Sequence, residues 1–363
     1  MIPYIFIAIF PIVLFLVAQQ ISIGYRKNCK NSTIFVRINW IYLFLAILPI
    51  GLMIALRNKS IGADTGVYIA RFKELQQIPW SELFDDTRME KGYLLFSKFI
   101  NSFISTNEVV FFSICSFICM LCIGIFAYKN CKQPILFVFL YVTLGLFTFM
   151  LSGLRQSLAM CICLLGFEFA KKRKFIPFLL VVLLAFTFHK SAVFYIFVYF
   201  IVNRMVNIKN IIIYSILAFI LILNLDRVQA YIGEALDYTY QIESTGNGGI
   251  FLLIMILITG FSWYYLKDDF DDIKIRALFN TNLIALFFWI ARLVTRTAER
   301  PSYYFLFATI ALFAETIVHP KKKENQKILL LIIIGCCLLL YVYRFYSNFS
   351  SFIPYRTFLS NEI

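Results

Sequence analysis

The chain has 363 residues, of which 61% are hydrophobic and only 15% are charged. These values exclude an ordinary soluble domain and indicate a polytopic membrane protein. The formal net charge of +14 does not indicate a nucleic-acid partner, because the basic residues lie in short connectors between apolar segments.

The apolar segments are predicted to be membrane helices, so the expected fold class is all-α. They lack the alternation of polar and apolar residues that barrel strands show. The first segment lacks a basic leader and a small-residue cleavage site, so we interpret it as a span rather than a signal peptide. We expect a single integral membrane domain over residues 1–363 with about twelve transmembrane or half-membrane helices. They fall at residues 2–24, 38–56, 108–127, 133–151, 152–170, 175–188, 190–203, 209–224, 249–266, 277–294, 301–318 and 328–345.

The basic residues predict which side of the bilayer each connector faces. The connector after the first span carries Arg26, Lys27, Lys30 and Arg37 and no acidic residue, which favours the cytoplasmic side. Alternation then places the N-terminus outside. The other predicted inner connectors are also basic, at residues 129–132, 171–174, 204–209, 267–276 and 321–327.

Residues 175–203 are predicted to form a helical hairpin. Basic residues flank both ends of this apolar run, so both ends are expected on the inner side, with His189 and Lys190 at the apex. Each arm of about 14 residues would be about 21 Å long, which is shorter than the hydrocarbon core. The apex is therefore expected below the outer surface, beside a wet cavity or packed against protein.

Two outer connectors are longer than turns, at residues 57–107 and 225–249. The first contains GYLLFSKFINSFI, which is too short to span, so we expect a short surface or re-entrant helix there. The second ends in the flexible sequence ESTGNGG. A lid and a passive linker both remain open for it.

Charged residues at the predicted outer face form a candidate site for an amphiphile with a phosphate head. Such groups at or inside a membrane are costly and are usually functional or paired. Arginine suits the task because it binds phosphate by bidentate contacts. The candidates are Arg57, Asp64, Glu90, Arg155, His189, Lys190, Arg292, Arg296 and Arg300.

Other interpretations of these charges remain open. Arg292, Arg296 and Arg300 recur every four residues, which predicts a stripe on one helical face. Arg57, Arg292 and Arg300 are also compatible with side chains that simply reach the membrane interface. Asp64 and Glu90 are also compatible with simple pairing to Arg57 and Lys91.

Five short motifs follow one another between about residues 50 and 195. They are R-x6-D (Arg57, Asp64), then Tyr68, then E-x-G-Y (Glu90, Gly92, Tyr93), G-x-R-Q-x-x-A (Gly153, Arg155, Gln156, Ala159) and F-H-x-S-A (Phe188, His189, Ser191, Ala192). Together they resemble the EpsG family of bacterial membrane proteins, Wzy-like polysaccharide polymerases that are similar to GT-C glycosyltransferases. Beyond this region the resemblance is limited to hydropathy and the late arginines.

The resemblance implies a polymerase of undecaprenyl-diphosphate-linked oligosaccharides in the bacterial inner (plasma) membrane, with its active site facing the periplasm. The growing chain would move from its lipid carrier to the next lipid-linked repeat unit, without a cofactor or metal. We favour O-antigen, the polysaccharide of lipopolysaccharide, over capsule or exopolysaccharide as the product. A chain-length regulator is a candidate partner besides the lipid bilayer.

This chemistry assigns roles to the candidates. A leaving lipid diphosphate needs charge stabilisation, which we expect from Arg155. The acceptor hydroxyl needs a general base, for which His189, Asp64 and Glu90 are candidates and His189 is preferred. The expected substrate-binding residues are Arg57, Tyr68, Arg155, Gln156, Lys190, Arg292, Arg296 and Arg300.

Two competing functions use similar charges. An O-antigen ligase-like transferase would move finished chains to another acceptor. A flippase or transporter of lipid-linked oligosaccharide would usually present charges at mid-membrane, whereas the charges here gather on one predicted side.

Overall fold

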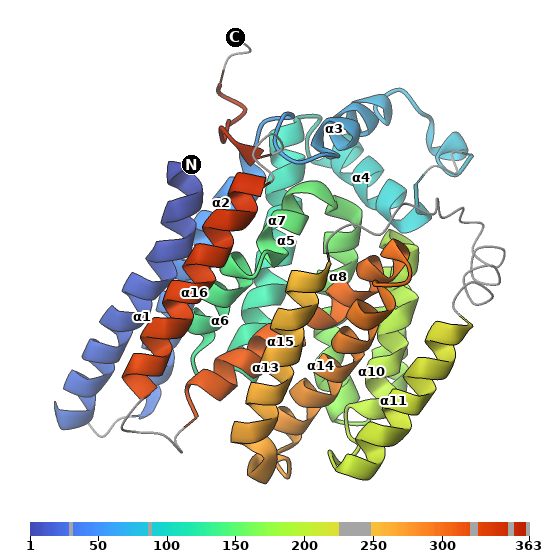
Figure 1. Ribbon diagram of the computed structural model, residues 1–363. Coiled ribbons are helices and arrows are strands. Elements are labelled where there is room, and N and C mark those ends of the chain that lie inside the picture. Colours follow the sequence, from blue (N-terminus) through green and yellow to red (C-terminus); the bar gives the residue numbers. More distant parts are fainter. Residues whose placement is uncertain (29–31, 86–88, 225–247, 320–325, 348–351, 361–363) are drawn as a thin grey trace. The chain divides into compact units, whose positions relative to one another are not determined.

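The computed structural model describes residues 1–28, 32–85, 89–224, 248–319, 326–347 and 352–360 (Figure 1). Within these residues the secondary structure is helical, apart from one isolated antiparallel bridge between Arg57 and Thr357. The predicted all-α fold class is therefore confirmed. The described chain forms two compact units.

The first unit comprises Met1–Leu165, Thr187–His189 and Lys322–Ile363. In it, α2 packs on α1, α5 and α6, and α16 packs on α6, whereas the short helices α3 and α4 pack on each other and on α5. The helices are α1 (Ile2–Asn28), α2 (Ser32–Ala55), α3 (Thr65–Glu74), η1 (Trp80–Glu82), α4 (Lys91–Phe103), α5 (Glu108–Asn130), α6 (Pro134–Thr143), α7 (Leu146–Ser152), most of α8 (Leu154–Lys171) and α16 (Gln326–Ser347).

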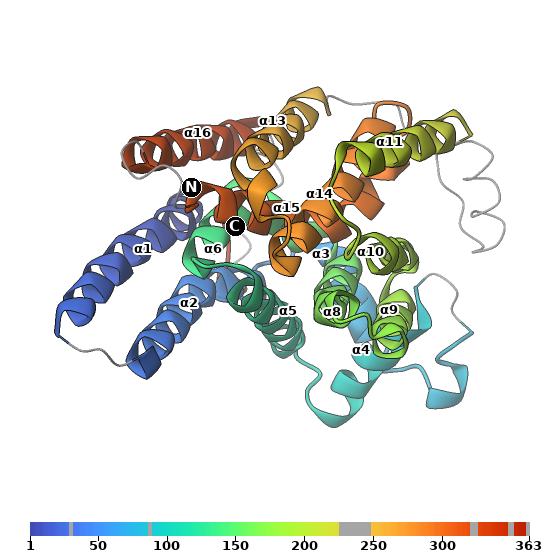
Figure 2. The same cartoon turned by 90° about the horizontal axis from the view of Figure 1, so that it is seen from below.

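The second unit comprises Gly166–Phe186 and Lys190–Lys321. Its centre is the antiparallel pair α14 and α15, against which α13, α10 and η2 pack. Figure 2, the view from below, shows α13, α14 and α15 side by side. The helices are α9 (Phe175–Phe188), η2 (Lys190–Tyr195), α10 (Ile196–Ile201), α11 (Ile208–Leu223), α13 (Gly249–Leu266), η3 (Lys267–Asp269), α14 (Ile273–Ala291), η4 (Arg296–Ala298) and α15 (Glu299–Ile317).

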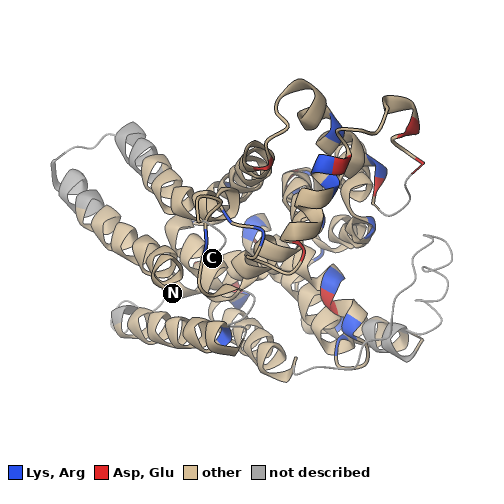
Figure 3. Cartoon of the chain, turned by 90° about the horizontal axis from the view of Figure 1, so that it is seen from above, with Lys and Arg blue, Asp and Glu red and all other residues tan. Residues whose placement is uncertain are grey.

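Five helices among the described residues are long and apolar enough to cross a membrane, or six if the bent pair α6 and α7 counts as one span. Figure 3 shows long helical stretches without a charged residue. Several shorter apolar helices accompany them, so the chain is a multi-pass membrane protein; the larger number of about twelve spans stays a prediction. The five are Ile2–Gln20, Glu108–Asn130, Gly249–Asp269, Ile273–Ala291 and Ile328–Ser347.

The segment predicted at residues 133–151 is not one continuous helix: α6 and α7 meet at a bend of 62° and together could form one broken span. Gly145 lies at the break with a φ of 90°, a conformation that L side chains rarely adopt. Arg344 of α16 donates a hydrogen bond to the Leu144 carbonyl, one of the acceptors that the broken helix leaves free. An arginine that is distant in sequence therefore stabilises the bend, and the periodicity of the helix sequence could not predict this contact.

Residues 175–203 run as two helical arms, and their placement in the membrane as a hairpin stays a prediction. The helix α9 ends at Phe188, and the chain returns through η2 and α10. Rings pair across the two arms, with Phe178 stacked on Tyr195 at 6.0 Å and Phe175 edge-on to Tyr199 at 5.0 Å between centroids. The break falls at His189, as expected, and the returning arm starts as a tight 3-10 turn.

The two long connectors have different outcomes. Residues 57–107 contain α3, η1 and α4, and α4 has only 13 residues, which is too short to span a membrane. The second connector, residues 225–249, lies outside the described residues except for its last two.

Gly62 sets how the loop after α2 packs on the end of α7. Its φ is 83°, and a Cβ atom there would lie 2.1 Å from the Leu151 carbonyl oxygen. We expect Gly62→Ala to lower the melting temperature in detergent, because the left-handed backbone alone costs about 1–2 kcal/mol before the clash is counted. Gly66→Ala is the matched control, since its nearest atom, Lys59 O, lies 3.9 Å away. Equal melting temperatures of the two variants would contradict this packing.

Candidate functional site

Arg57, directly after α2, is built into the core of the first unit. Its Nε donates to Thr65 Oγ1 at 3.1 Å, its Nη1 donates to the Ile54 carbonyl, and its guanidinium lies 4.2 Å from the centre of the Phe112 ring. The residue is only 2% exposed. Burial lowers the pKa of the Arg57 guanidinium to about 10, so the group still carries its charge near neutral pH.

The charge of Arg57 is not balanced by a carboxylate. None of the ion pairs in the described part of the chain includes it, and its Nη2 is buried without a hydrogen-bond partner. Simple pairing with Asp64 is wrong: the Asp64 carboxylate is exposed and makes no capping hydrogen bond to α3. A buried cation without a carboxylate creates a positive potential around it.

Residues 352–360 hold the segment that carries Arg57. The Asn58 amide donates to the Arg356 carbonyl at 2.9 Å, and the Phe358 amide donates to the Leu56 carbonyl at 3.0 Å. The Tyr355 hydroxyl adds a bond to the Met53 carbonyl at 2.9 Å. The tail, for which the sequence suggested no task, therefore forms part of the wall behind Arg57.

The loop between Arg57 and α3 connects this wall to the start of α8. The Ala63 amide donates to Ser152 Oγ at 3.2 Å, and the Thr65 hydroxyl lies 3.1 Å from the Leu151 carbonyl. Only Gly153 and Leu154 separate this contact from Arg155. The R-x6-D and G-x-R-Q motifs are thus brought together through backbone contacts.

Tyr68, Glu90 and Arg155, which we call the Arg155 cluster, come from three different segments of the first unit. Arg155 Nη1 forms an ion pair with Glu90, and the Arg155 guanidinium lies next to the Tyr68 phenol. Burial raises the pKa of Tyr68, and the adjacent Arg155 guanidinium opposes the rise. Glu90 pairs with Arg155, so the alternative of simple pairing with Lys91 is not supported.

Arg155 keeps part of its donor capacity. Its side chain is 25% exposed, whereas the Glu90 side chain is 7% exposed. Its Nε is buried and makes no hydrogen bond. A partly exposed guanidinium that is oriented by a carboxylate and a phenol can therefore still donate to an incoming anion.

The start of α4 places the His189 segment in the same unit. A Cβ atom on Gly92 would lie 2.1 Å from Thr187 Oγ1, so only glycine allows this close approach. Phe96, one turn further along α4, packs on Phe188 at 5.7 Å between ring centroids. His189 follows directly and is 8% exposed. The E-x-G-Y and F-H motifs therefore meet at a tight helix contact.

The remaining predicted residues differ in burial. Gln156, next to Arg155, is 4% exposed, and Tyr68 is also 4% exposed. Lys190, Arg292, Arg296 and Arg300 belong to the second unit, where Lys190 opens η2 and is half-buried.

The predicted arginine stripe on one helical face is wrong. α14 ends at Ala291 and α15 begins at Glu299, so Arg292, Arg296 and Arg300 lie on a turn, a 3-10 helix and a new helix. Arg292 is buried: its Nε pairs with Glu299 Oε2 at 2.7 Å. The Tyr303 hydroxyl donates to the other oxygen of the same carboxylate at 2.7 Å. Arg296 and Arg300 are exposed.

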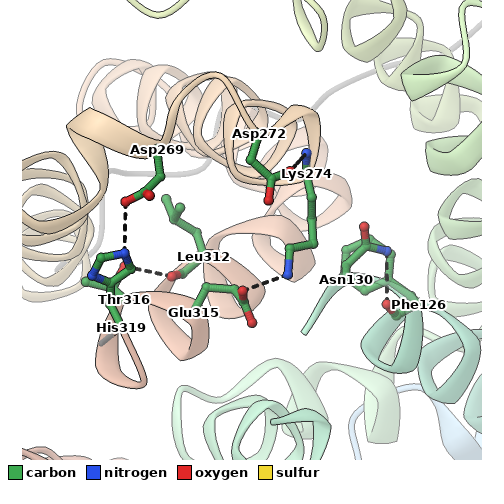
Figure 4. Close-up of polar contacts among 9 residues, drawn as sticks. All are labelled: Phe126, Asn130, Asp269, Asp272, Lys274, Leu312, Glu315, Thr316 and His319. Carbon is green, nitrogen blue, oxygen red and sulfur yellow. Dashed lines mark hydrogen bonds and ion pairs between the residues drawn. The ribbon is translucent and has the colours of Figure 1, made fainter. Parts of the chain in front are cut away.

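A second polar cluster lies at the other end of α14 and α15 (Figure 4). Lys274 Nζ donates to Glu315 Oε2 at 2.8 Å, and His319 Nε2 lies 2.8 Å from Asp269 Oδ2. Thr316 Oγ1 lies 2.8 Å from Ser262 Oγ on α13. Each carboxylate already faces a nitrogen of its own, so this cluster ties three helices together rather than offering an open site.

No metal site is apparent in the part of the chain that the structure describes. It holds no group of three or more His, Cys, Asp or Glu side chains that could bind an ion.

Comparison with known protein families gives one match. The model of the EpsG family matches residues 40–357, which is most of the chain. The chain belongs to the EpsG family. EpsG family members are Wzy-like polymerases, so the resemblance inferred from five short motifs is confirmed. Searches of curated proteins and of solved structures find no match.

Sequence reasoning missed two contributors to the site. Thr65 binds Arg57 and reaches the Leu151 carbonyl, and it is fully buried. Tyr93 was named only as part of the E-x-G-Y motif. It is 1% exposed, and its ring packs edge-on against that of Tyr68, with 6.0 Å between the ring centroids. The spacing of Thr65 after Arg57 carries no periodic signal, so only the fold reveals this pair.

The ion pair of Lys274 and Glu315 allows a stability test. Glu315 has a side chain that is 1% exposed. We expect Lys274→Met to destabilise the protein by about 3–5 kcal/mol, because the buried carboxylate loses its counter-charge. Adding Glu315→Gln should recover most of that loss. Lys267→Met, at an exposed lysine on the same turn, is the control, and thermal unfolding in detergent is the measurement; an equal loss in both lysine variants would refute the pairing.

Proposed function

We propose that this EpsG family protein transfers a growing polysaccharide from undecaprenyl diphosphate onto the next lipid-linked oligosaccharide repeat unit. The protein would lie in the inner membrane, with its active site facing the periplasm. O-antigen is the favoured product, and the mechanism would be GT-C-like and metal-independent. The observation that carries the proposal is the Arg155 cluster, a partly exposed arginine that a carboxylate and a phenol orient.

The leaving group explains the need for arginine. When the anomeric C–O bond breaks, the electron pair passes to the diphosphate oxygen, whose negative charge must be stabilised. Arg155 would donate to this oxygen while Glu90 and Tyr68 hold its orientation. Arg57 is buried, so it would act through its unbalanced charge rather than by contact.

The acceptor side needs a base. The acceptor hydroxyl forms the new bond to the anomeric carbon and gives its proton to the base. Glu90 is already paired with Arg155 and Asp64 is exposed, whereas His189 is enclosed at the hairpin apex. These differences support His189 as the base. Tyr68 and Gln156 would line the site. Lys190, Arg296 and Arg300, in the second unit, stay candidates for substrate binding from the sequence alone, whereas Arg292 already pairs with Glu299.

Substitution of Arg155 tests the proposal. In a strain that lacks the chromosomal gene, Arg155→Ala is expected to lower polymer formation by about 10²-fold or more. Arg155→Lys keeps the charge but not the bidentate geometry, so it should recover only part of the activity. Gel ladders of polymer at matched membrane levels are the measurement. Arg204→Ala, at an exposed arginine, is the control. Full ladders from Arg155→Ala would refute the proposal.

Substitution of His189 tests the base. His189→Ala is expected to lower the rate of chain extension by about 10²–10⁴-fold while the affinity for lipid-linked substrate stays close to that of the wild type. Purified protein with lipid-linked repeat units provides both values. Unchanged turnover would transfer the role to Glu90 or Asp64. Accumulation of single repeats in cells would indicate lost polymerisation, whereas complete absence of surface sugar would favour a ligase or flippase.

The periplasmic orientation has its own test. Ser60 and Asp271 are both exposed, and they are predicted to lie on the outer and inner sides. In intact cells, a membrane-impermeant thiol reagent is expected to label Ser60→Cys and to leave Asp271→Cys unmodified until the membrane is permeabilised. Labelling of both positions before permeabilisation would contradict the orientation.

A further inference from the structure

One face of α4 and the adjoining η1 exposes a group of large apolar side chains. Five side chains on this face are 44–68% exposed, and three of the five are aromatic. Their rings touch: Trp80 lies 5.8 Å from Phe103, and Phe99 lies 5.2 Å from Phe103, between centroids. We call this surface the α4 patch; it consists of Trp80, Leu95, Phe99, Phe103 and Ile104.

The α4 patch cannot turn inward, because the opposite face of α4 is fixed. Tyr93, Leu94 and Ile100 on that face are each at most 1% exposed. Lys98 Nζ donates to the carbonyls of Leu75 and Ile78, both at 2.7 Å, and so binds α4 to the end of α3.

Asn101 Nδ2 also donates a hydrogen bond to the Phe72 carbonyl at 3.0 Å, which adds a contact between α4 and α3. With these polar groups satisfied underneath, the aromatic side chains necessarily point away from the first unit. Large exposed apolar patches mark surfaces that contact another phase or partner.

The position of the α4 patch along the chain places it at the membrane boundary. Ile104 precedes Glu108, the first residue of the spanning helix α5, by only four residues. Such a linker reaches at most about 14 Å.

Polar groups mark the level at which α5 leaves the membrane. Asn107 caps α5 by accepting a hydrogen bond from Val109, and the exposed Lys73 pairs with Glu108 at 3.1 Å. The end of α4 therefore lies close to that level, while α4 itself, at 13 residues or about 20 Å, is too short to cross.

We infer that η1 and α4 lie in the interface between lipid headgroups and acyl chains, with the α4 patch inserted into the bilayer. Aromatic rings, tryptophan above all, favour this interface. The patch continues the lipid-facing surface of α5, on which Phe117 and Leu121 are 68% and 50% exposed. Of the two expected forms of this helix, surface-bound and re-entrant, the structure therefore supports the surface-bound form. It would anchor Glu90, which directly precedes α4, at a fixed depth.

Fluorescence quenching by brominated lipids tests this inference in full-length protein reconstituted into vesicles. The contribution of Trp80 is the difference between wild type and Trp80→Phe. We expect it to be quenched more strongly by phosphatidylcholine brominated near the headgroup end of its chains than by lipid brominated near the chain ends.

Two other tryptophans serve as references. Trp40, which is 42% exposed on α2, should be quenched, and Trp289, which is 5% exposed, should not. Trp80 fluorescence that brominated lipid leaves unchanged but aqueous iodide quenches would overturn the inference. Quenching by neither agent would also overturn it and would indicate cover by protein.

A second variant guards against a local effect of losing Trp80. Phe103→Trp in the Trp80→Phe background places a new indole at the most exposed position of the patch, 68% exposed. We expect it to restore headgroup-depth quenching. An unquenched indole at this position would overturn the inference even if Trp80→Phe had altered the η1 turn.

Discussion

A charged side chain inside an apolar protein needs a partner, and the ion pair of Arg155 with Glu90 meets this requirement in the first unit. Glu90 stands directly before α4, and Arg155 lies in the first turn of α8. Because Arg155 also lies next to Tyr68 of α3, one guanidinium brings together three segments from separate parts of the sequence. The glycines at positions 62 and 92 serve this arrangement, since each permits a close contact that a larger residue would block.

The buried charges are not all balanced to the same extent. Lys274 and Glu315 neutralise each other, which suits a helix clamp. Arg57 has no carboxylate, and Arg155 retains an unbonded Nε beside its partner. Excess positive charge in a protein interior is costly, so it persists only where something anionic compensates for it. That imbalance is what the proposed role in binding an anionic leaving group requires, and the pair of Lys274 and Glu315 lacks it.

Sequence could predict the parts of this fold that depend on local patterns. Hydropathy predicted the helical class, and the order of the motifs predicted the family. It failed where distant residues decide the structure. Arg344 supports the bend at Gly145, and the turn between α14 and α15 interrupts the arginines at positions 292, 296 and 300. Likewise, no periodicity links Thr65 to Arg57.

Residues 56–58 form backbone hydrogen bonds with residues 356–358, so this contact can form only after residues 356–358 have been synthesised. The side-chain bond from Asn58 to Thr357 spans 299 positions, so α2 enters the bilayer long before its partner leaves the ribosome. During that interval the segment around Arg57 lacks its hydrogen bonds to Tyr355 and the neighbouring residues. The surroundings of Arg57 are therefore completed only after residues 352–360 have been synthesised.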